Sequence, residues 1–106
     1  MEQLLKQVTQ YIRHIADPER IILFGSVAAG NNNVYSDIDL LIVIAAPHHR
    51  KHLIAAVRSY IHEHSMASDI LIMRPSELDA AMKCTDGFIS TALKNSRILY
   101  EKNSSK

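Results

Sequence analysis

Several residue types whose abundance is typical of particular classes of protein are scarce in this sequence. It has one cysteine, no tryptophan, three glycines and three prolines. A single cysteine, Cys84, excludes an internal disulfide and a cysteine-based zinc site, and is typical of a reducing compartment. The sequence also lacks the apolar run of about 18 residues that a transmembrane helix needs, and the apolar core of a signal peptide. We therefore expect a cytoplasmic protein with no membrane partner.

An excess of charge of one sign is also lacking, since 12 Lys and Arg residues oppose 11 Asp and Glu residues. The basic residues are scattered among acids, which gives no strong signal for nucleic-acid binding. Apolar residues make up 47% and charged residues 22% of the chain, an ordinary balance for a globular protein. At 106 residues we expect one small domain, residues 1–106.

Hydrophobic periodicity predicts an alternation of helices and strands. Helices are expected over residues 2–15, 49–64, 76–84 and 88–93, and strands over residues 21–24, 37–44, 69–73 and 97–100. A short helical piece is expected at residues 27–29, and Ser76 is the expected N-cap of its helix, with Asp79 completing a capping box. This order predicts an α/β (α+β) single domain: a mixed β-sheet with helices packed mainly on one face.

Two features that suit a nucleotide and its metal lie within residues 21–44. Asp37 and Asp39 begin a strand, and the alternation of side chains puts both carboxylates on one face. Neighbouring carboxylates repel unless a cation lies between them, and hard oxygen ligands suit Mg²⁺. Gly25 allows close backbone approach, and Ser26 offers a hydroxyl to a phosphate.

Asp69 begins the next expected strand. If that strand lies beside Asp37 and Asp39, three acids could hold two metal ions, with Asp69 as a ligand and a candidate base. Alone, a Gly-Ser turn is usually only a turn, and two aspartates at a strand end are often structural. The combination of the two favours a site.

Other residues that could carry chemistry give weaker signals. His48, His49 and His52 have helical spacing, but no third ligand is clearly placed, so a zinc site is disfavoured. Nothing near Cys84 in the sequence would activate its thiol. Tyr35 could either stack on a base or cover the strand.

The Gly25-Ser26 pair, ten intervening residues (27–36) and then the two aspartates of the segment SDIDL (Ser36 to Leu40) together resemble the signature of the nucleotidyltransferase superfamily of DNA polymerase beta type. In particular, the chain resembles a minimal nucleotidyltransferase (MNT) domain. The similarity extends to Asp69 with the ILIMRPSEL that follows it, and to GFISTALKNSRILYE, so it covers nearly the whole chain.

This resemblance implies Mg²⁺-dependent transfer of a nucleoside monophosphate from a nucleoside triphosphate to a hydroxyl, with release of pyrophosphate. The implied catalytic residues and ligands of two Mg²⁺ ions are Asp37, Asp39 and Asp69; the implied nucleotide-binding and phosphate-binding residues are Gly25, Ser26 and Ser36.

The resemblance also implies a partner protein and a biological role. Many MNT domains are antitoxins that adenylylate HEPN proteins, helical ribonuclease toxins encoded beside them, so we expect ATP as the donor and a HEPN-type partner. An antitoxin that neutralises its partner by binding alone, and transfer to a small-molecule hydroxyl, are alternatives. The oligomeric state stays open, and a homo-oligomer is possible.

The chain departs from the family pattern after Gly25-Ser26. Family members often read GSRARG, whereas this chain reads GSVAAG and lacks both arginines. Either another cation, such as Arg74 or Lys51, contacts the phosphates, or binding of the triphosphate is weak.

Overall fold

The computed structural model describes residues 2–28, 30, 37–45, 49–84 and 87–102; of residues 26 and 27 it describes the backbone. The elements in chain order are α1 Glu2–Ile15, β1 Arg20–Phe24, α2 Gly25–Ala28, β2 Ile38–Val43, α3 Arg50–His62, β3 Ser68–Met73, α4 Pro75–Met82, α5 Phe88–Ala92, the 3₁₀ helix η1 Leu93–Asn95 and β4 Arg97–Glu101. Every expected strand and long helix is present, with ends that differ by one or two residues.

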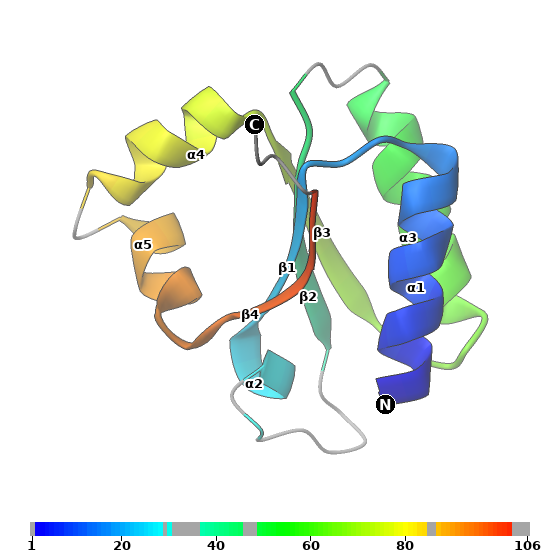
Figure 1. The fold of residues 1–106 in the computed structure, drawn as a ribbon. Helices are drawn as coiled ribbons and strands as arrows, with labels where there is room; N and C mark the ends of the chain where they lie inside the picture. The colour runs from blue at the N-terminus through cyan, green and yellow to red at the C-terminus, as the bar shows by residue number, and fades with distance from the viewer. Residues whose placement is uncertain (1, 29, 31–36, 46–48, 85–86, 103–106) are drawn as a thin grey trace.

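The four strands form one mixed sheet in the order β3-β2-β1-β4. β1 pairs antiparallel with both β2 and β4, whereas β2 pairs parallel with β3. The parallel pair needs a crossover connection, which α3 supplies between the two strands (Figure 1). β1 and β2 are therefore the inner strands, and β4, which corresponds to the strand expected over residues 97–100, lies at an edge.

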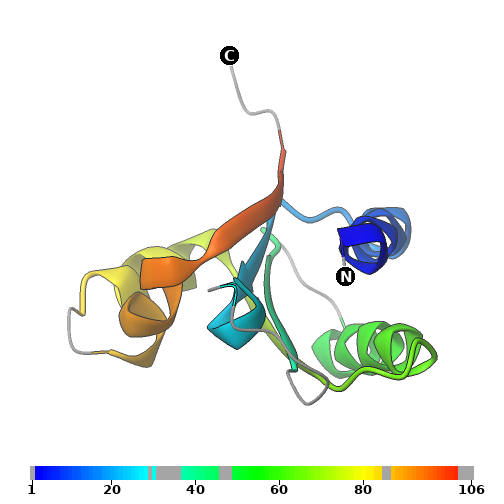
Figure 2. The same cartoon turned by 90° about the horizontal axis from the view of Figure 1, so that it is seen from below.

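The two longest helices, α1 and α3, cover one face of the sheet (Figure 2). Strand side chains that point to this face, such as those of Ile21, Leu40 and Ile42, pack against Val8 and Val57, and all five residues are fully buried. This is the face that the period-2 pattern assigned to the even-numbered residues of β2. The main helical layer of the predicted fold is confirmed.

The shorter helices α4 and α5 lie on the opposite face (Figures 1 and 2). Ile22, Phe24, Leu41 and Val43 form a second cluster of buried residues there with Leu78 of α4. This cluster is smaller than the first, so the sheet is covered less completely on this side. Asp39 and Leu41 have the same parity in β2, so Asp39 belongs to this thinly covered face.

The start of α4 differs from the prediction. The helix begins at Pro75 with Arg74 as its N-cap, not with Ser76, and Glu77 rather than Asp79 completes the cap. The Arg74 N–H donates to Oε1 of Glu77 over 2.7 Å. Proline fits the first position of a helix because its φ is already helical and its missing N–H would have no intrahelical partner there. The helix can therefore start one residue earlier.

The short helix α2 also begins earlier than predicted, at Gly25 directly after β1 rather than at residue 27. Residue 29, the predicted end of this helix, and the C-terminal residues 103–106 lie outside the described residues. Among the described helices, none has the length and apolar character to cross a membrane.

Candidate functional site

The parallel pairing of β2 and β3 brings two of the predicted acids together. In the register of the pair, Asp39 stands opposite Asp69, just as Ile38 stands opposite Ser68. Neighbouring strands lie about 4.8 Å apart, and side chains at paired positions point to the same face. The condition that the sequence left open, a strand carrying Asp69 beside Asp39, is therefore met.

Gly25 approaches Asp39 from the other side. Phe24, the last residue of β1, pairs with Asp39 in the antiparallel register, so Gly25 follows directly at the carboxylate. Its φ is +81°, in the left-handed region. A Cβ at this position would overlap Oδ2 of Asp39 and lie 3.0 Å from Cγ. Only glycine meets both the conformation and the space, so the backbone of Gly25 can lie directly against Asp39. Its approach to a phosphate stays a prediction.

The remaining predicted site residues are placed less completely. Asp37 is exposed and precedes β2 directly. The Ser26 backbone belongs to α2, next to Gly25. Ser36 lies outside the described residues, as does Tyr35.

A pocket of about 530 Å³ opens over the two acids. Its lining residues are Phe24, Gly25, Asp39, Asp69, Phe88, Thr91, Ala92 and Asn95. The strands supply an acidic end, and α5 and η1 supply an aromatic and polar wall. The volume is within the usual range for small-molecule sites, roughly 300–1,000 Å³.

The electrostatics of the pocket centre on Asp39. Partial burial raises the pKa of its carboxyl group, and the charges of Asp69 and Asp37 raise it further. All three effects disfavour the ionised carboxylate, and a cation placed among the acids would oppose the last two. A carboxyl group with a raised pKa at the end of a pocket is typical of a functional site.

The donor atoms suit a divalent cation that is shared with a substrate. Mg²⁺ is usually held by one or two carboxylates, with water and phosphate oxygens completing its shell, and Asp39 and Asp69 offer such a pair. Within the described residues, no group of three or more His, Cys, Asp or Glu side chains is arranged to hold a metal ion by itself. The residues therefore fit Mg²⁺ that arrives with a nucleotide better than a closed protein site.

The two cations suggested as substitutes for the missing arginines are far from the acids. Arg74 follows the last residue of β3, whereas Asp69 stands near its first, and five residues of strand span about 16 Å. Lys51 lies in the first turn of α3, next to Arg50, whose guanidinium contacts the Ile72 carbonyl near the same distant end. Arg74 and Lys51 therefore lie near the end of the sheet opposite to the acids, and the structure gives no support for a contact of either residue with the phosphates.

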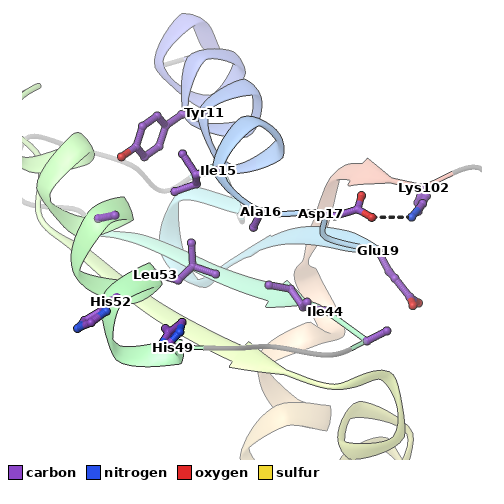
Figure 3. Close-up of a pocket in the computed structure, with 12 residues that line it drawn as sticks. Tyr11, Ile15, Ala16, Asp17, Glu19, Ile44, His49, His52, Leu53 and Lys102 are labelled. Atoms are coloured by element: carbon purple, nitrogen blue, oxygen red, sulfur yellow. Dashed lines mark hydrogen bonds and ion pairs between the residues drawn. The ribbon is translucent and has the colours of Figure 1, made fainter.

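A larger pocket, of about 770 Å³, lies at that opposite end, between α1 and α3 (Figure 3). His49 and His52 line it with their rings stacked at a centroid distance of 5.7 Å, and Lys102 donates to Asp17 over 3.0 Å at its rim. His48 lies outside the described residues. The described histidines belong to no group of three or more possible metal ligands.

Comparison with known proteins agrees with this fold. The family model for polymerase beta nucleotidyltransferases matches residues 6–105. A candidate nucleotidyltransferase from Sulfolobus solfataricus has a similar fold, with a TM-score of 0.56 at 20% identity over 99% of this chain and 84% of that one. A search of curated proteins gives no match.

Two further structures share the fold. A toxin–antitoxin structure with AMP-PNP aligns with a TM-score of 0.61 at 17% identity, over 92% of this chain and 74% of that one. A tri-AMPylated HEPN toxin from Shewanella oneidensis in complex with its MNT antitoxin aligns with a TM-score of 0.59 at 15% identity, over 95% and 73%.

The fold and the acidic pocket thus define a small α+β domain of the nucleotidyltransferase type. The chain belongs to the polymerase beta nucleotidyltransferase family. The sequence analysis identified Gly25, Asp39 and Asp69 but not the opposite wall of the pocket, which Phe88, Thr91 and Asn95 form. Phe88 was assigned only to a helix face, because its exposure depends on how α5 sits on the sheet.

Proposed function

We propose that the chain is a Mg²⁺-dependent nucleotidyltransferase that moves AMP from ATP to a hydroxyl of a partner protein. We further propose that this partner is a HEPN-type toxin and that the chain acts as its antitoxin. The observation that carries the proposal is the pairing of Asp39 with Asp69 under a pocket that Gly25 also lines. Family membership supports nucleotidyl transfer, and the partners named for the two toxin–antitoxin structures suggest the acceptor.

In the proposed reaction, the acceptor hydroxyl oxygen bonds to the α-phosphorus of ATP. The bond between that phosphorus and the oxygen bridging to the β-phosphate breaks, and pyrophosphate leaves with the bonding electrons. Asp69 takes the hydroxyl proton. Asp39 and Asp69 would hold the metal together with phosphate oxygens, and Asp37 would join them only when the metal is bound, since among the described residues the three acids are not already grouped as a metal site. Gly25 and Ser26 bind the phosphates with their backbone N–H groups. When bound, Mg²⁺ would neutralise phosphate charge and steady the leaving pyrophosphate.

The proposal is tested by incubating the purified chain with ATP, Mg²⁺ and a co-expressed HEPN-type partner, and by weighing the partner with intact-mass spectrometry. The expected result is one or more AMP increments on the partner. Asp39→Asn should abolish them, because it removes a metal-binding charge while keeping the size of the side chain.

The matched control is Asp79→Asn on α4. Asp79 is exposed and does not line the pocket, so this variant should modify the partner at the wild-type rate. Circular dichroism of both variants shows whether the fold is retained. Equal loss of activity in the two variants would contradict a specific role for Asp39.

A second candidate function is neutralisation by binding alone. It is favoured by the lining of the pocket, whose described residues include two carboxylates and no cationic side chain to hold a triphosphate. Under this alternative, the partner is inhibited without gaining mass, and Asp39→Asn inhibits it as well as the wild type does. The same experiment therefore separates the two functions.

A further inference from the structure

We propose that Phe88 is the stacking platform for the nucleobase of the bound nucleotide, and hence a binding residue of the acidic pocket. The inference deepens the proposed function and rests on it. Phe88 lines the pocket together with Asp39 and Asp69, yet 67% of its surface is exposed. It is the most exposed of the large apolar side chains in the described part of the chain.

The ring of Phe88 is held in place although it is exposed. It meets the ring of Phe24 edge to face, with a centroid distance of 6.4 Å and an interplanar angle of 84°. Phe24 is itself buried in the sheet, so the contact connects Phe88 to the core. A ring held in this way loses little conformational freedom when a ligand stacks on it.

The helix that carries Phe88 is also fixed at its start. The Ser90 hydroxyl donates to the Cys84 carbonyl over 2.7 Å, which joins the first turn of α5 to the chain that follows α4. The Thr91 N–H donates to the Gly87 carbonyl over 3.1 Å and closes the same turn. These bonds fix the backbone that carries Phe88, and the contact with Phe24 orients its ring, so no ligand is needed to set the position of the ring.

The two ends of the pocket match the two ends of a nucleotide. The acids suit a metal–phosphate group, whereas Phe88 offers the π-face on which any base can stack. Thr91 and Asn95 lie in the same wall, and their side chains can donate and accept hydrogen bonds. A base stacked on Phe88 would have these groups within the same pocket.

The absence of tryptophan provides a direct test. Phe88→Trp places the sole tryptophan of the protein in the pocket. Its fluorescence should be quenched by ATP with Mg²⁺, at an affinity within a few-fold of the wild type, but not by tripolyphosphate, which has the phosphates and no base. Ile15→Trp is the control, because Ile15 is partly exposed at the opposite end of the sheet, and ATP should leave its fluorescence unchanged.

Removal of the Phe88 ring tests how much base stacking contributes to the affinity for ATP. Since stacking on an aromatic side chain contributes about 1–3 kcal/mol per base, Phe88→Ala should weaken ATP binding roughly 5- to 150-fold. Binding of tripolyphosphate, measured by isothermal titration calorimetry, should stay within two-fold. Because Phe88 is largely exposed, the variant should fold.

Three outcomes are decisive. If the wild type binds ATP and Phe88→Ala binds it equally well, the stacking role is wrong while the proposed function stands. If Phe88→Ala retains ATP binding but no longer modifies the partner, the ring contacts the acceptor protein instead, which also overturns the inference. If the wild type binds neither ATP nor tripolyphosphate in the presence of Mg²⁺, the nucleotide site itself fails, and with it both proposals.

Discussion

Asp39 and Asp69 stand opposite each other on two parallel strands, so the separation of their carboxylates is set by the backbone pairing of the sheet. The backbone of neither residue can move away without disturbing the pairing of β2, whose side chains are mostly buried, with β3, where Ile70 and Ile72 are buried. The repulsion between the two charges is therefore part of the folded protein in the absence of a cation. This has a measurable effect on stability.

The first prediction concerns pH. Because burial, Asp69 and Asp37 raise the pKa of Asp39, the folded state binds a proton at Asp39 more tightly than the unfolded state does. The resulting stabilisation is complete below the ordinary pKa of aspartate and is lost as the pH rises through the folded pKa. Asp39→Asn should therefore gain stability relative to the wild type as the pH approaches neutrality, with a constant difference above the folded pKa.

Urea unfolding at several pH values, in buffer with EDTA, measures this difference. Asp79→Asn serves as the control, and its stability relative to the wild type should change little over the same range. If the gap between Asp39→Asn and the wild type does not widen with rising pH, the raised pKa of Asp39 is refuted. Mg²⁺ in place of EDTA should narrow the gap, because a cation offsets the repulsion that the substitution removes.

The second prediction compares two glycines that share a backbone conformation. Gly25 and Gly30 have φ values of +81° and +83°, so alanine at either position costs about 1–2 kcal/mol of backbone strain. Only at Gly25 would the new Cβ also overlap Asp39, because nothing lies within 4 Å of a Cβ at Gly30. Gly25→Ala should therefore destabilise the protein more than Gly30→Ala, and it alone should abolish nucleotide binding.

Thermal unfolding and ATP titration of the two variants separate these effects. The backbone strain cancels in the comparison, so the difference between the variants reports the overlap with Asp39. Equal losses of stability and of ATP binding in both variants would show that the close approach of Gly25 to Asp39 has no functional role.

The third prediction concerns Glu77 at the start of α4. The backbone N–H of Arg74 lowers the pKa of the Glu77 carboxyl group. The guanidinium of Arg50, 3.1 Å from Glu77, lowers this pKa further. Glu77→Ala removes both interactions and should lower the Tm by a few degrees, whereas Glu77→Gln can still accept from Arg74 and should lower it less. Because the pKa is lowered, this stabilisation exists above the ordinary pKa of glutamate and is lost as the pH falls through the folded value. The Tm difference between Glu77→Gln and the wild type should therefore shrink at acidic pH.

The fourth prediction tests the sheet itself. Leu41 is fully buried on β2, two residues from Asp39, and Leu41→Ala should cost about 2–5 kcal/mol in the free energy of unfolding. Ile98 on the edge strand β4 is 53% exposed, and Ile98→Ala should change that free energy by less than about 0.5 kcal/mol. Similar losses in the two variants, measured by urea unfolding, would contradict the assignment of β2 as an inner strand and β4 as an edge strand.

The sequence predicted those parts of the site that depend only on the local alternation of side chains along a strand. Period-2 alternation placed Asp39 and Leu41 on one face of β2, and Ile38, Leu40 and Ile42 on the other. The sequence also supplied Asp69 as the start of a strand. It could not show that this strand pairs parallel with β2 and in register, because strand pairing depends on the whole sheet.

The parts that the sequence missed depend on tertiary position. Arg74 and Lys51 are close in sequence to strand ends, but only the direction of the strands shows that these ends are remote from the acids. The sequence placed Phe88 only within a short helix, and its exposure follows from the way α5 lies on the sheet. The N-cap of α4 was misplaced because Ser76 is a better capping residue than Arg74, whereas Pro75 at the first helical position decided the start.

The crossover through α3 has a consequence for how the protein acquires its site. Asp39 and Asp69 meet only after the chain between them has closed into a loop and β3 has docked beside β2, a non-local step that costs loop-closure entropy and is slow compared with local helix formation. Gly25 and Asp39, in contrast, belong to an antiparallel pair that can form without β3. During folding, Gly25 and Asp39 should therefore come together before Asp69 joins them. The chain should become able to bind a nucleotide only in this last step.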